Sequence, residues 1–182
     1  MEILEIEIKS YCDDRAPVVE KLKAMGARPA GSEKELDLYL NHPGRDFKDT
    51  DEALRLRRTG GRVIMTYKGP KIGTAAKTRL EEEVAVSDFE KALAILKNLG
   101  FVEFGSVTKM RDVYRLGEME VCLDTVEGVG RFVEIEMKGS ERERIEQELF
   151  RVAGRLGLER FERRSYLELK YGNPGTGKNA RE

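Results

Sequence analysis

Alternation of charged and apolar side chains near the start of the chain constrains its fold more than any other feature. Over Leu4–Lys9, the charged residues Glu5, Glu7 and Lys9 alternate with leucine and isoleucine. Successive side chains of a β-strand point to opposite faces of the sheet, so the pattern predicts a strand with one charged and one apolar face. Taken alone, the segment favours an ordinary strand whose charged face contacts solvent.

The same alternation returns in most of the strands that the sequence predicts. We expect strands near residues 2–10, 36–41, 53–59, 62–69, 79–86, 107–115, 118–125, 131–138 and 164–171. Bases dominate some charged faces and acids dominate others. The charged faces carry Arg55 and Arg57, Lys68, Arg79 with Glu81 and Glu83, Lys109 and Arg111, Glu134 and Glu136, and Glu168 with Lys170.

Three amphipathic helices are expected to cover the apolar face of this sheet. The first begins near Asp13 or Asp14, and the other two begin at capping-box patterns that start with Ser87 and Ser140. Each is expected to end at a glycine in the left-handed conformation, at Gly26, Gly100 and Gly157. The sheet beneath them can either leave its charged face in water or close into a barrel with the charges inside.

Composition narrows the classes of partner. The 182-residue chain has 33 basic and 34 acidic residues and a net charge of −1, whereas a general nucleic-acid binder would be strongly basic. No signal peptide and no apolar stretch of membrane-spanning length are present, so we expect a cytoplasmic protein without a membrane partner.

We expect one domain over residues 1–171 and a loose tail over 172–182. Cys12 and Cys122 are expected to be reduced thiols without metal-type spacing.

The charged faces indicate a chemistry as well as a fold. Two carboxylates on one strand face repel each other unless a cation lies between them. Glutamate oxygens without histidine or cysteine suit Mg²⁺ or Mn²⁺, while arginine and lysine suit phosphate. Together these residue types indicate a site for a metal–polyphosphate complex, with a solvent-exposed sheet as the alternative.

Glu5–Lys9 resembles the ExExK signature of the CYTH superfamily, the triphosphate tunnel metalloenzymes, which include class IV adenylyl cyclases and thiamine triphosphatases. Further charged landmarks of that family follow in order, and the resemblance extends from Glu2 to about Tyr171. The segment from Asp37 to Arg55 is similar to the CyaB-like branch of class IV adenylyl cyclases. The landmarks are Arg55-x-Arg57, Lys68, Arg79-x-Glu81-x-Glu83, Lys109-x-Arg111, Asp124, Glu134-x-Glu136 and Lys170.

The resemblance implies an α+β fold, an eight-stranded antiparallel closed β-barrel with a charged interior, flanked by about three helices. It implies that one or two Mg²⁺ or Mn²⁺ ions bind to Glu5, Glu7, Glu83, Asp124, Glu134 and Glu136. It implies that a triphosphate contacts Lys9, Arg55, Arg57, Lys68, Arg79, Lys109, Arg111 and Lys170, with Lys9, Arg57 and Arg111 as catalytic residues. It also suggests a homodimer.

Three functions remain open at this point. The first is a class IV adenylyl cyclase, which converts ATP to cyclic AMP and pyrophosphate. The second is a hydrolase of inorganic triphosphate, thiamine triphosphate or another organic triphosphate. The third is a module that binds a nucleotide or polyphosphate without turnover. A pocket for a nucleobase could draw on Tyr39, Phe47, Tyr67 and Tyr166, whose positions the sequence does not assign.

Overall fold

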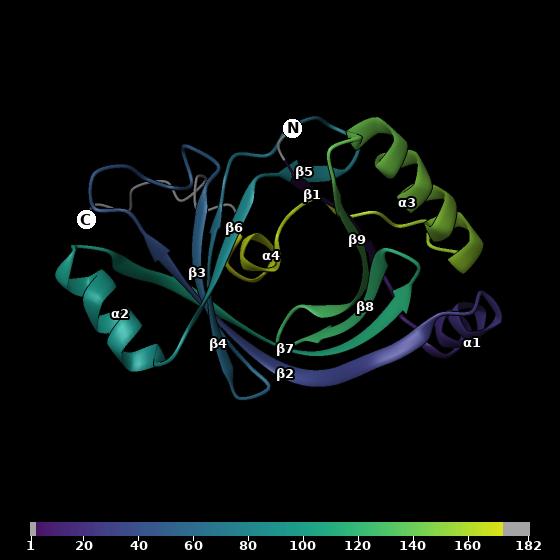
Figure 1. Cartoon of the computed structure of the whole chain (residues 1–182), viewed down its shortest axis with the longest axis horizontal. Helices are drawn as coiled ribbons and strands as arrows, with labels where there is room; N and C mark the ends of the chain where they lie inside the picture. Colours follow the sequence, from purple (N-terminus) through teal and green to yellow (C-terminus); the bar gives the residue numbers. More distant parts are fainter. Residues whose placement is uncertain (1–2, 173–182) are drawn as a thin grey trace, which may run out of the picture.

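The computed structural model describes residues 3–172, so the expected tail lies almost entirely outside the described residues. Within this range nine strands form one antiparallel sheet, three helices lie on its outside, and a fourth, short helix borders its interior (Figure 1). The strands are β1 (Leu4–Tyr11), β2 (Arg28–Asn41), β3 (Ala53–Thr59), β4 (Arg62–Lys68), β5 (Lys77–Arg79), β6 (Glu81–Val86), β7 (Val102–Leu116), β8 (Met119–Val126) and β9 (Gly130–Gly139). The helices are α1 (Ala16–Ala24), α2 (Phe89–Asn98), α3 (Arg142–Leu156) and α4 (Tyr166–Tyr171).

The sheet closes on itself through a single interrupted strand. Its order is β5-β1-β9-β8-β7-β2-β3-β4-β6, and only Leu80 separates β5 from β6 at the two ends. Before Leu80 the chain pairs with β1, and after it with β4. The predicted closed barrel is therefore confirmed as a nearly closed one. It has nine strands rather than eight because the expected strand over 79–86 changes partner at Leu80.

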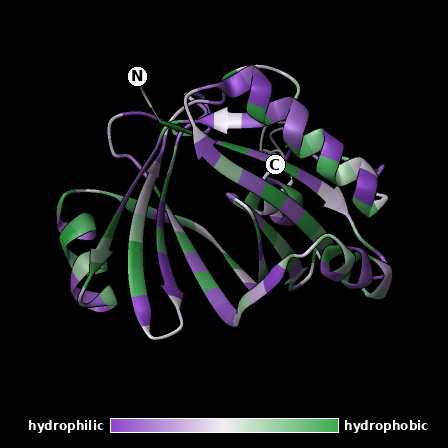
Figure 2. Ribbon diagram, turned by 45° about the vertical axis from the view of Figure 1, so that its right-hand side comes forward, coloured by the Kyte–Doolittle hydropathy of each residue, from purple (hydrophilic) through white to green (hydrophobic). Residues whose placement is uncertain are grey.

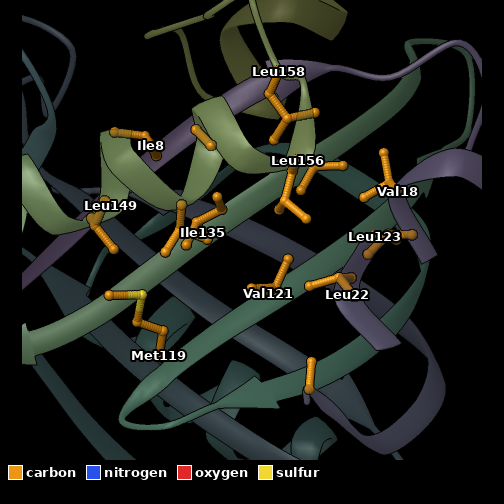
Figure 3. Close-up of a cluster of buried hydrophobic side chains, with 14 of the residues drawn as sticks. Ile8, Val18, Leu22, Met119, Val121, Leu123, Ile135, Leu149, Leu156 and Leu158 are labelled. Atoms are coloured by element: carbon orange, nitrogen blue, oxygen red, sulfur yellow. The ribbon is translucent and has the colours of Figure 1, made fainter. Parts of the chain in front are cut away.

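The apolar sides of the strands pack outward against the helices. Ile6 and Ile8 of β1 and Ile135 of β9 belong to a buried cluster with Leu22 of α1 and Leu149 of α3 (Figure 3). Figure 2 shows apolar and polar residues alternating along the strands, as a two-sided sheet requires. Each fully buried leucine or isoleucine contributes about 1.5–3 kcal/mol, which fixes the orientation of the charged faces toward the interior.

A second cluster performs the same role at the other end of the sheet. Leu54 and Leu56 of β3 are buried together with Phe89 and Leu96 of α2. The expectation that the apolar strand faces lie beneath the helices is thus confirmed for both clusters.

The helix boundaries confirm the predicted ends and correct the predicted starts. Gly26, Gly100 and Gly157 have φ values of 81°, 93° and 79°, the left-handed conformation expected after each helix. The cap of α2 is Asp88 rather than Ser87, because the Asp88 carboxylate accepts a hydrogen bond from the Lys91 amide at 3.0 Å. The predicted capping box at Ser140 is wrong, since α3 begins after Glu141 without a side-chain cap.

The predicted strand over 164–171 is wrong, because most of this segment forms the short helix α4. Ser165 caps it: its hydroxyl accepts a hydrogen bond from the Glu168 amide, and the Glu168 carboxylate accepts one from the Ser165 amide. The helix lies against β7 at Gly105, where a Cβ atom would come within 2.9 Å of the Tyr171 ring. Glycine at this position therefore permits the close approach of α4 to the sheet.

Two strands are longer than the sequence predicts. β2 begins at Arg28 and β7 at Val102, where strands were expected from residues 36 and 107. The added segments pair with neighbouring strands, with Arg28 opposite Arg115 and Val102 opposite Asn41. No helix among residues 3–172 is both long enough and apolar enough to cross a membrane.

Candidate functional site

A cavity of about 860 Å³ occupies the interior of the barrel. Charged side chains from every strand line it, as the inward-facing positions of an alternating sequence must in a closed sheet. Twelve of the fourteen predicted site residues lie on its surface: Glu5, Glu7, Lys9, Arg55, Arg57, Lys68, Arg79, Glu83, Lys109, Arg111, Glu134 and Glu136. The barrel thus brings into one cavity residues that are up to 131 positions apart, Glu5 and Glu136, in the chain.

Four of the carboxylates form what we call the acidic wall: Glu5, Glu7, Glu120 and Glu136. The strand register aligns three of them, because Glu7 of β1 lies opposite Glu136 of β9, which in turn lies opposite Glu120 of β8. Oxygens of Glu5, Glu7 and Glu136 lie within 4.8 Å of one another. A basic side chain forms an ion pair with the carboxylate at each end of this row: Lys77 contacts Glu7 at 2.7 Å, and Arg115 contacts Glu120 at 2.7 Å.

The carboxylates of the acidic wall differ in how well their charge is balanced. Burial, followed by the charge of Glu5, raises the pKa of Glu136 to about 8. Burial also raises the pKa of Glu5. Burial acts in the same direction on Glu7, but Lys77 and Lys9 outweigh it and lower the pKa of that carboxyl. Among the described residues, Glu136 has neither an ion pair nor a hydrogen bond, so it is the member most in need of a cation.

Glu5, Glu7 and Glu136 fit a hard divalent cation. All three supply oxygen, the ligand that Mg²⁺ and Mn²⁺ prefer. Burial, together with the neighbouring carboxylates, raises the pKa values of Glu5 and Glu136, so their ionised forms are disfavoured without an added positive charge. A bound cation would supply this charge.

Three bases form what we call the basic wall: Arg57 of β3, with Lys109 and Arg111 of β7. Arg57 donates two hydrogen bonds to Asp37, at 2.6 and 2.8 Å, and contacts Glu35 at 3.0 Å. Lys109 contacts the same two acids, at 2.7 Å for Glu35 and 3.2 Å for Asp37. Although burial opposes it, Lys109 and Arg57 hold the pKa of Asp37 well below its usual range. Each base is thereby held rigidly at the cavity surface.

Lys9 connects the cavity to the segment that leads into α4. Its ammonium donates a hydrogen bond to the Arg164 carbonyl at 2.5 Å and lies 4.3 Å from the centre of the Tyr166 ring. It also lies 3.8 Å from Glu134. Burial, followed by the charge of Lys77, lowers the pKa of Lys9. Of the aromatic residues considered for a nucleobase, Tyr39, Phe47 and Tyr166 line the cavity, whereas Tyr67 does not.

The structure does not bring two of the predicted site residues into the cavity. Asp124 is fully buried behind Arg111, and its oxygens accept hydrogen bonds from Arg111 at 2.8 and 2.6 Å and from the Tyr166 hydroxyl at 2.8 Å. It therefore orients Arg111, and it does not belong to the cluster formed by Glu5, Glu7 and Glu136. Lys170 lies on α4, is exposed, and donates a hydrogen bond to the Ser106 carbonyl at 2.8 Å. Its predicted position depended on the strand that proved to be a helix.

Sequence reasoning missed several residues that do line the cavity. They are Glu35, Asp37, Lys77, Glu120 and Cys122. Lys77 could have been found, because it lies two residues before Arg79 and so shares its face. Glu120 and Cys122 likewise share a face of β8 with Asp124. Arg79, which was predicted to contact the triphosphate, also lines the cavity. This residue is 5 % exposed, and among the described residues its Nε atom has no hydrogen-bond partner and it has no ion pair.

This constellation matches a known family. The sequence profile of the CYTH domain matches residues 4–166. The chain belongs to the CYTH domain family. The predicted resemblance is thus confirmed, and it covers nearly all of the barrel and its site.

Named relatives of the chain include two cyclase-like proteins. The protein "Putative adenylate cyclase MJ0240" of Methanocaldococcus jannaschii is 40 % identical over 173 residues, covering 92 % of this chain and 99 % of its own. "Adenylate cyclase CyaB" of Aeromonas hydrophila is 29 % identical over 143 residues, covering 75 % of this chain and 72 % of its own.

Solved structures share the fold. The PH1819 protein of Pyrococcus horikoshii OT3 superimposes with a TM-score of 0.83 at 42 % identity, covering 91 % of this chain and 97 % of that one. HpAC1 of Hippeastrum, a protein described as having a dominant triphosphatase activity, shares the fold at 18 % identity, with a TM-score of 0.64 and coverage of 91 % and 93 %.

Proposed function

We propose that this protein is a metal-dependent enzyme that processes a triphosphate, and that its reaction is that of a class IV adenylyl cyclase. The observation that carries the proposal is the single cavity in which the acidic wall and the basic wall meet. Carboxylates for a divalent cation and guanidinium groups for phosphate oxygens are the parts that phosphoryl transfer needs, since it depends on positioning and charge stabilisation.

Glu5, Glu7 and Glu136 would hold Mg²⁺ or Mn²⁺ in this proposal. When bound, such an ion neutralises phosphate charge and fixes the orientation of the triphosphate. The chain's own bases would contact the remaining phosphate oxygens. Arg57 and Arg111 suit this task because a planar guanidinium binds phosphate through two parallel hydrogen bonds.

Several bases differ in their freedom to bind phosphate. Arg57 and Arg111 already hold carboxylates, so their orientation is set before a ligand arrives. Arg79 is buried without such a partner among the described residues, so phosphate would supply its missing counter-charge. The cavity therefore combines fixed and uncompensated cations along the path of a triphosphate.

The names of the relatives favour the cyclase, since one is named "Putative adenylate cyclase MJ0240" and the other "Adenylate cyclase CyaB". A triphosphatase is the second candidate, because HpAC1 has the same fold and a described triphosphatase activity. The two reactions share the same charge requirements and differ in the attacking group, the ribose 3′-hydroxyl in one and water in the other. We place the protein in the cytoplasm and retain a homodimer as part of the proposal.

Product analysis tests the proposal. The full chain is incubated with ATP, inorganic triphosphate or thiamine triphosphate, each with Mg²⁺ and with Mn²⁺, and the products are identified. Cyclic AMP with pyrophosphate supports the cyclase, and orthophosphate supports the triphosphatase. Saturable binding of all three compounds without any turnover would reject both enzymes and leave a binding module.

A further inference from the structure

A second cluster of metal-ligating atoms lies beside the first, and it contains a thiol. Glu120, Cys122 and Glu136 each offer one atom, and these three atoms lie within 4.8 Å of one another. Glu120 and Cys122 are two residues apart on β8 and so share its inner face, while Glu136 lies directly opposite Glu120 on β9. Glu136 therefore stands between this cluster and the one formed with Glu5 and Glu7.

Cys122 is the member of the cluster whose own environment points to a ligand. Its side chain is fully buried, it borders the cavity, and among the described residues its sulfur forms no hydrogen bond. A free buried cysteine usually packs as a small apolar residue. Here its charged surroundings include Arg111, Glu134 and Glu136, which are poor neighbours for an apolar group.

The two carboxylates have oxygens available to complete the site. Glu136 has no ion pair or hydrogen bond within residues 3–172. Glu120 uses one oxygen, Oε1, to contact Arg115 at 2.7 Å, which leaves Oε2 for another partner. The cluster thus presents one sulfur atom and the oxygens of two carboxylates toward one point.

We propose that Glu120, Cys122 and Glu136 bind a thiophilic divalent cation of the zinc class, at a site that adjoins the Mg²⁺ or Mn²⁺ site and shares Glu136 with it. Thiolate sulfur selects such ions over Mg²⁺, and a mixed set of sulfur and oxygen ligands suits Zn²⁺ and Co²⁺. Three protein ligands leave a fourth tetrahedral position open toward the cavity. On binding, the sulfur–metal bond forms as the thiol proton leaves to solvent.

Shared use of Glu136 links this site to the proposed function. A carboxylate has two oxygens and can contact an ion on each side, so occupancy of one site changes the ligand set of the other. The proposal rests on the proposed function in this respect alone, because the thiol cluster would bind its ion whether or not the cavity turns over a triphosphate.

Cobalt binding tests the site, because Co²⁺ reports a bound thiolate by a charge-transfer absorption band in the near ultraviolet. The metal-free full chain is titrated with Co²⁺ under reducing, oxygen-free conditions. We expect the band to grow to saturation in the wild type and to be absent in Cys122→Ser. Glu120→Gln should weaken Co²⁺ binding by roughly tenfold or more, since losing even an outer partner of a metal site costs 10–100-fold.

Cys12 provides the matched control, because it is the other buried free cysteine and lies outside the cavity. Cys12→Ser should keep the band. A band that persists in Cys122→Ser, a band lost in Cys12→Ser, or Co²⁺ binding without any band in the wild type would overturn the proposal. Thermal unfolding of each variant shows that it is folded, and Glu120→Gln repeats the test without altering a thiol.

Glu7→Gln separates this proposal from the proposed function, because Glu7 belongs only to the first cluster. The variant should keep the cobalt band while losing turnover with Mn²⁺. Loss of the band would show that cobalt binding at the thiol also needs Glu7. The two clusters would then be one site, and the proposal of a separate thiol site would be overturned. Retained turnover would count against the proposed function and leave the thiol site standing.

Discussion

The acidic wall and the basic wall lie in the same cavity but are balanced differently. On the basic wall, Arg57 and Arg111 each hold a buried aspartate through two hydrogen bonds. On the acidic wall, Glu136 has no such partner among the described residues, and its pKa rises to about 8. The arginines of the basic wall are therefore paired within the protein, whereas the acidic wall contains a carboxylate that is not, within the described part of the chain.

This difference indicates which side chains of the cavity are held in place before a ligand binds and which are not. In the proposed function, paired guanidinium groups would hold their geometry before a triphosphate binds, which would reduce the entropy lost on binding. Unbalanced carboxylates attract a cation, since crowded like charges in a buried place are costly. The predictions below test this contrast, from the largest expected effect to the smallest.

Removing a charge from the acidic wall should abolish turnover. Glu7→Gln and Glu136→Gln each lose a metal contact, and we expect turnover to fall by about a thousandfold or more, equivalent to roughly 4 kcal/mol. Steady-state rates at saturating Mn²⁺ measure the effect. Glu82→Gln is the control, because Glu82 is exposed and does not line the cavity. Near-full activity of either first-named variant would show that its carboxylate is not a metal ligand.

Removing a base from the basic wall should weaken both catalysis and folding. Arg111→Ala loses a charge-assisted contact to phosphate worth roughly 1.5–3 kcal/mol, and it leaves Asp124 as an unpaired buried charge at a cost of about 3–5 kcal/mol in stability. Arg111→Lys should restore only part of the activity. Kinetics and urea unfolding measure the two losses.

The double variant Arg111→Ala with Asp124→Asn sharpens this test. It removes both charges of the pair, so stability should largely return while activity stays low. The corresponding pair for the other arginine is Arg57→Ala with Asp37→Asn. If the double variant regained activity together with stability, Arg111 would contribute only to the stability of the fold and not to catalysis.

Stability without metal should fall as pH rises. The raised pKa of Glu136, about 8 against an ordinary 4.5, means that the folded protein keeps a proton that the unfolded chain has already lost. Between these two values the unfolded state binds fewer protons, so unfolding becomes easier with increasing pH. We expect a loss of about 1–2 kcal/mol between pH 6 and 8.5, because Glu136 borders a cavity that admits water.

Urea unfolding at the two pH values measures this slope, and Glu136→Gln should flatten it. Added Mn²⁺ should flatten it as well in the wild type, since a bound cation favours the ionised carboxylate. An identical slope in wild type and variant would show that Glu136 ionises normally and that the acidic wall needs no cation.

Lys170→Ala should have almost no effect. Lys170 is exposed on α4 and contacts the Ser106 carbonyl, so its removal should change stability by less than about 0.5 kcal/mol and leave kcat/KM unchanged. Lys109→Ala is the comparison, because Lys109 lies on the basic wall. A loss of activity in Lys170→Ala similar to that in Lys109→Ala would show that Lys170 takes part in the site, as the sequence predicted.

Most of the barrel and its lining could be predicted because alternation decides which face each side chain occupies. The error at 164–171 has a physical cause: Leu167 and Leu169 alternate with charged residues, and six residues are too few to separate a strand period from a helix period. The capping pattern Ser165-x-x-Glu168 did mark the helix start.

Other features depend on depth and pairing, which one sequence does not specify. Asp124 has the alternation expected of an inward residue, yet Arg111 and Tyr166 cover it. Lys77 lies in a strand of three residues, which gives no periodic signal of its own, so its face could be inferred only from its spacing of two residues from Arg79. The interruption at Leu80 follows from barrel closure, which joins strands that are far apart in the chain.

The closure of the barrel also determines when the site can form during synthesis. β1 is synthesised before the other strands of the sheet, yet its partners are β5 and β9, and β9 spans Gly130–Gly139. Until these segments exist, β1 is an unpaired edge whose apolar face, with Ile6 and Ile8, is open to other chains. The cavity that Glu5 and Glu7 line therefore forms only after β9 has been made. A nascent chain that stalls before β9 is a species prone to aggregation, and its first strand is the segment that a chaperone would need to protect.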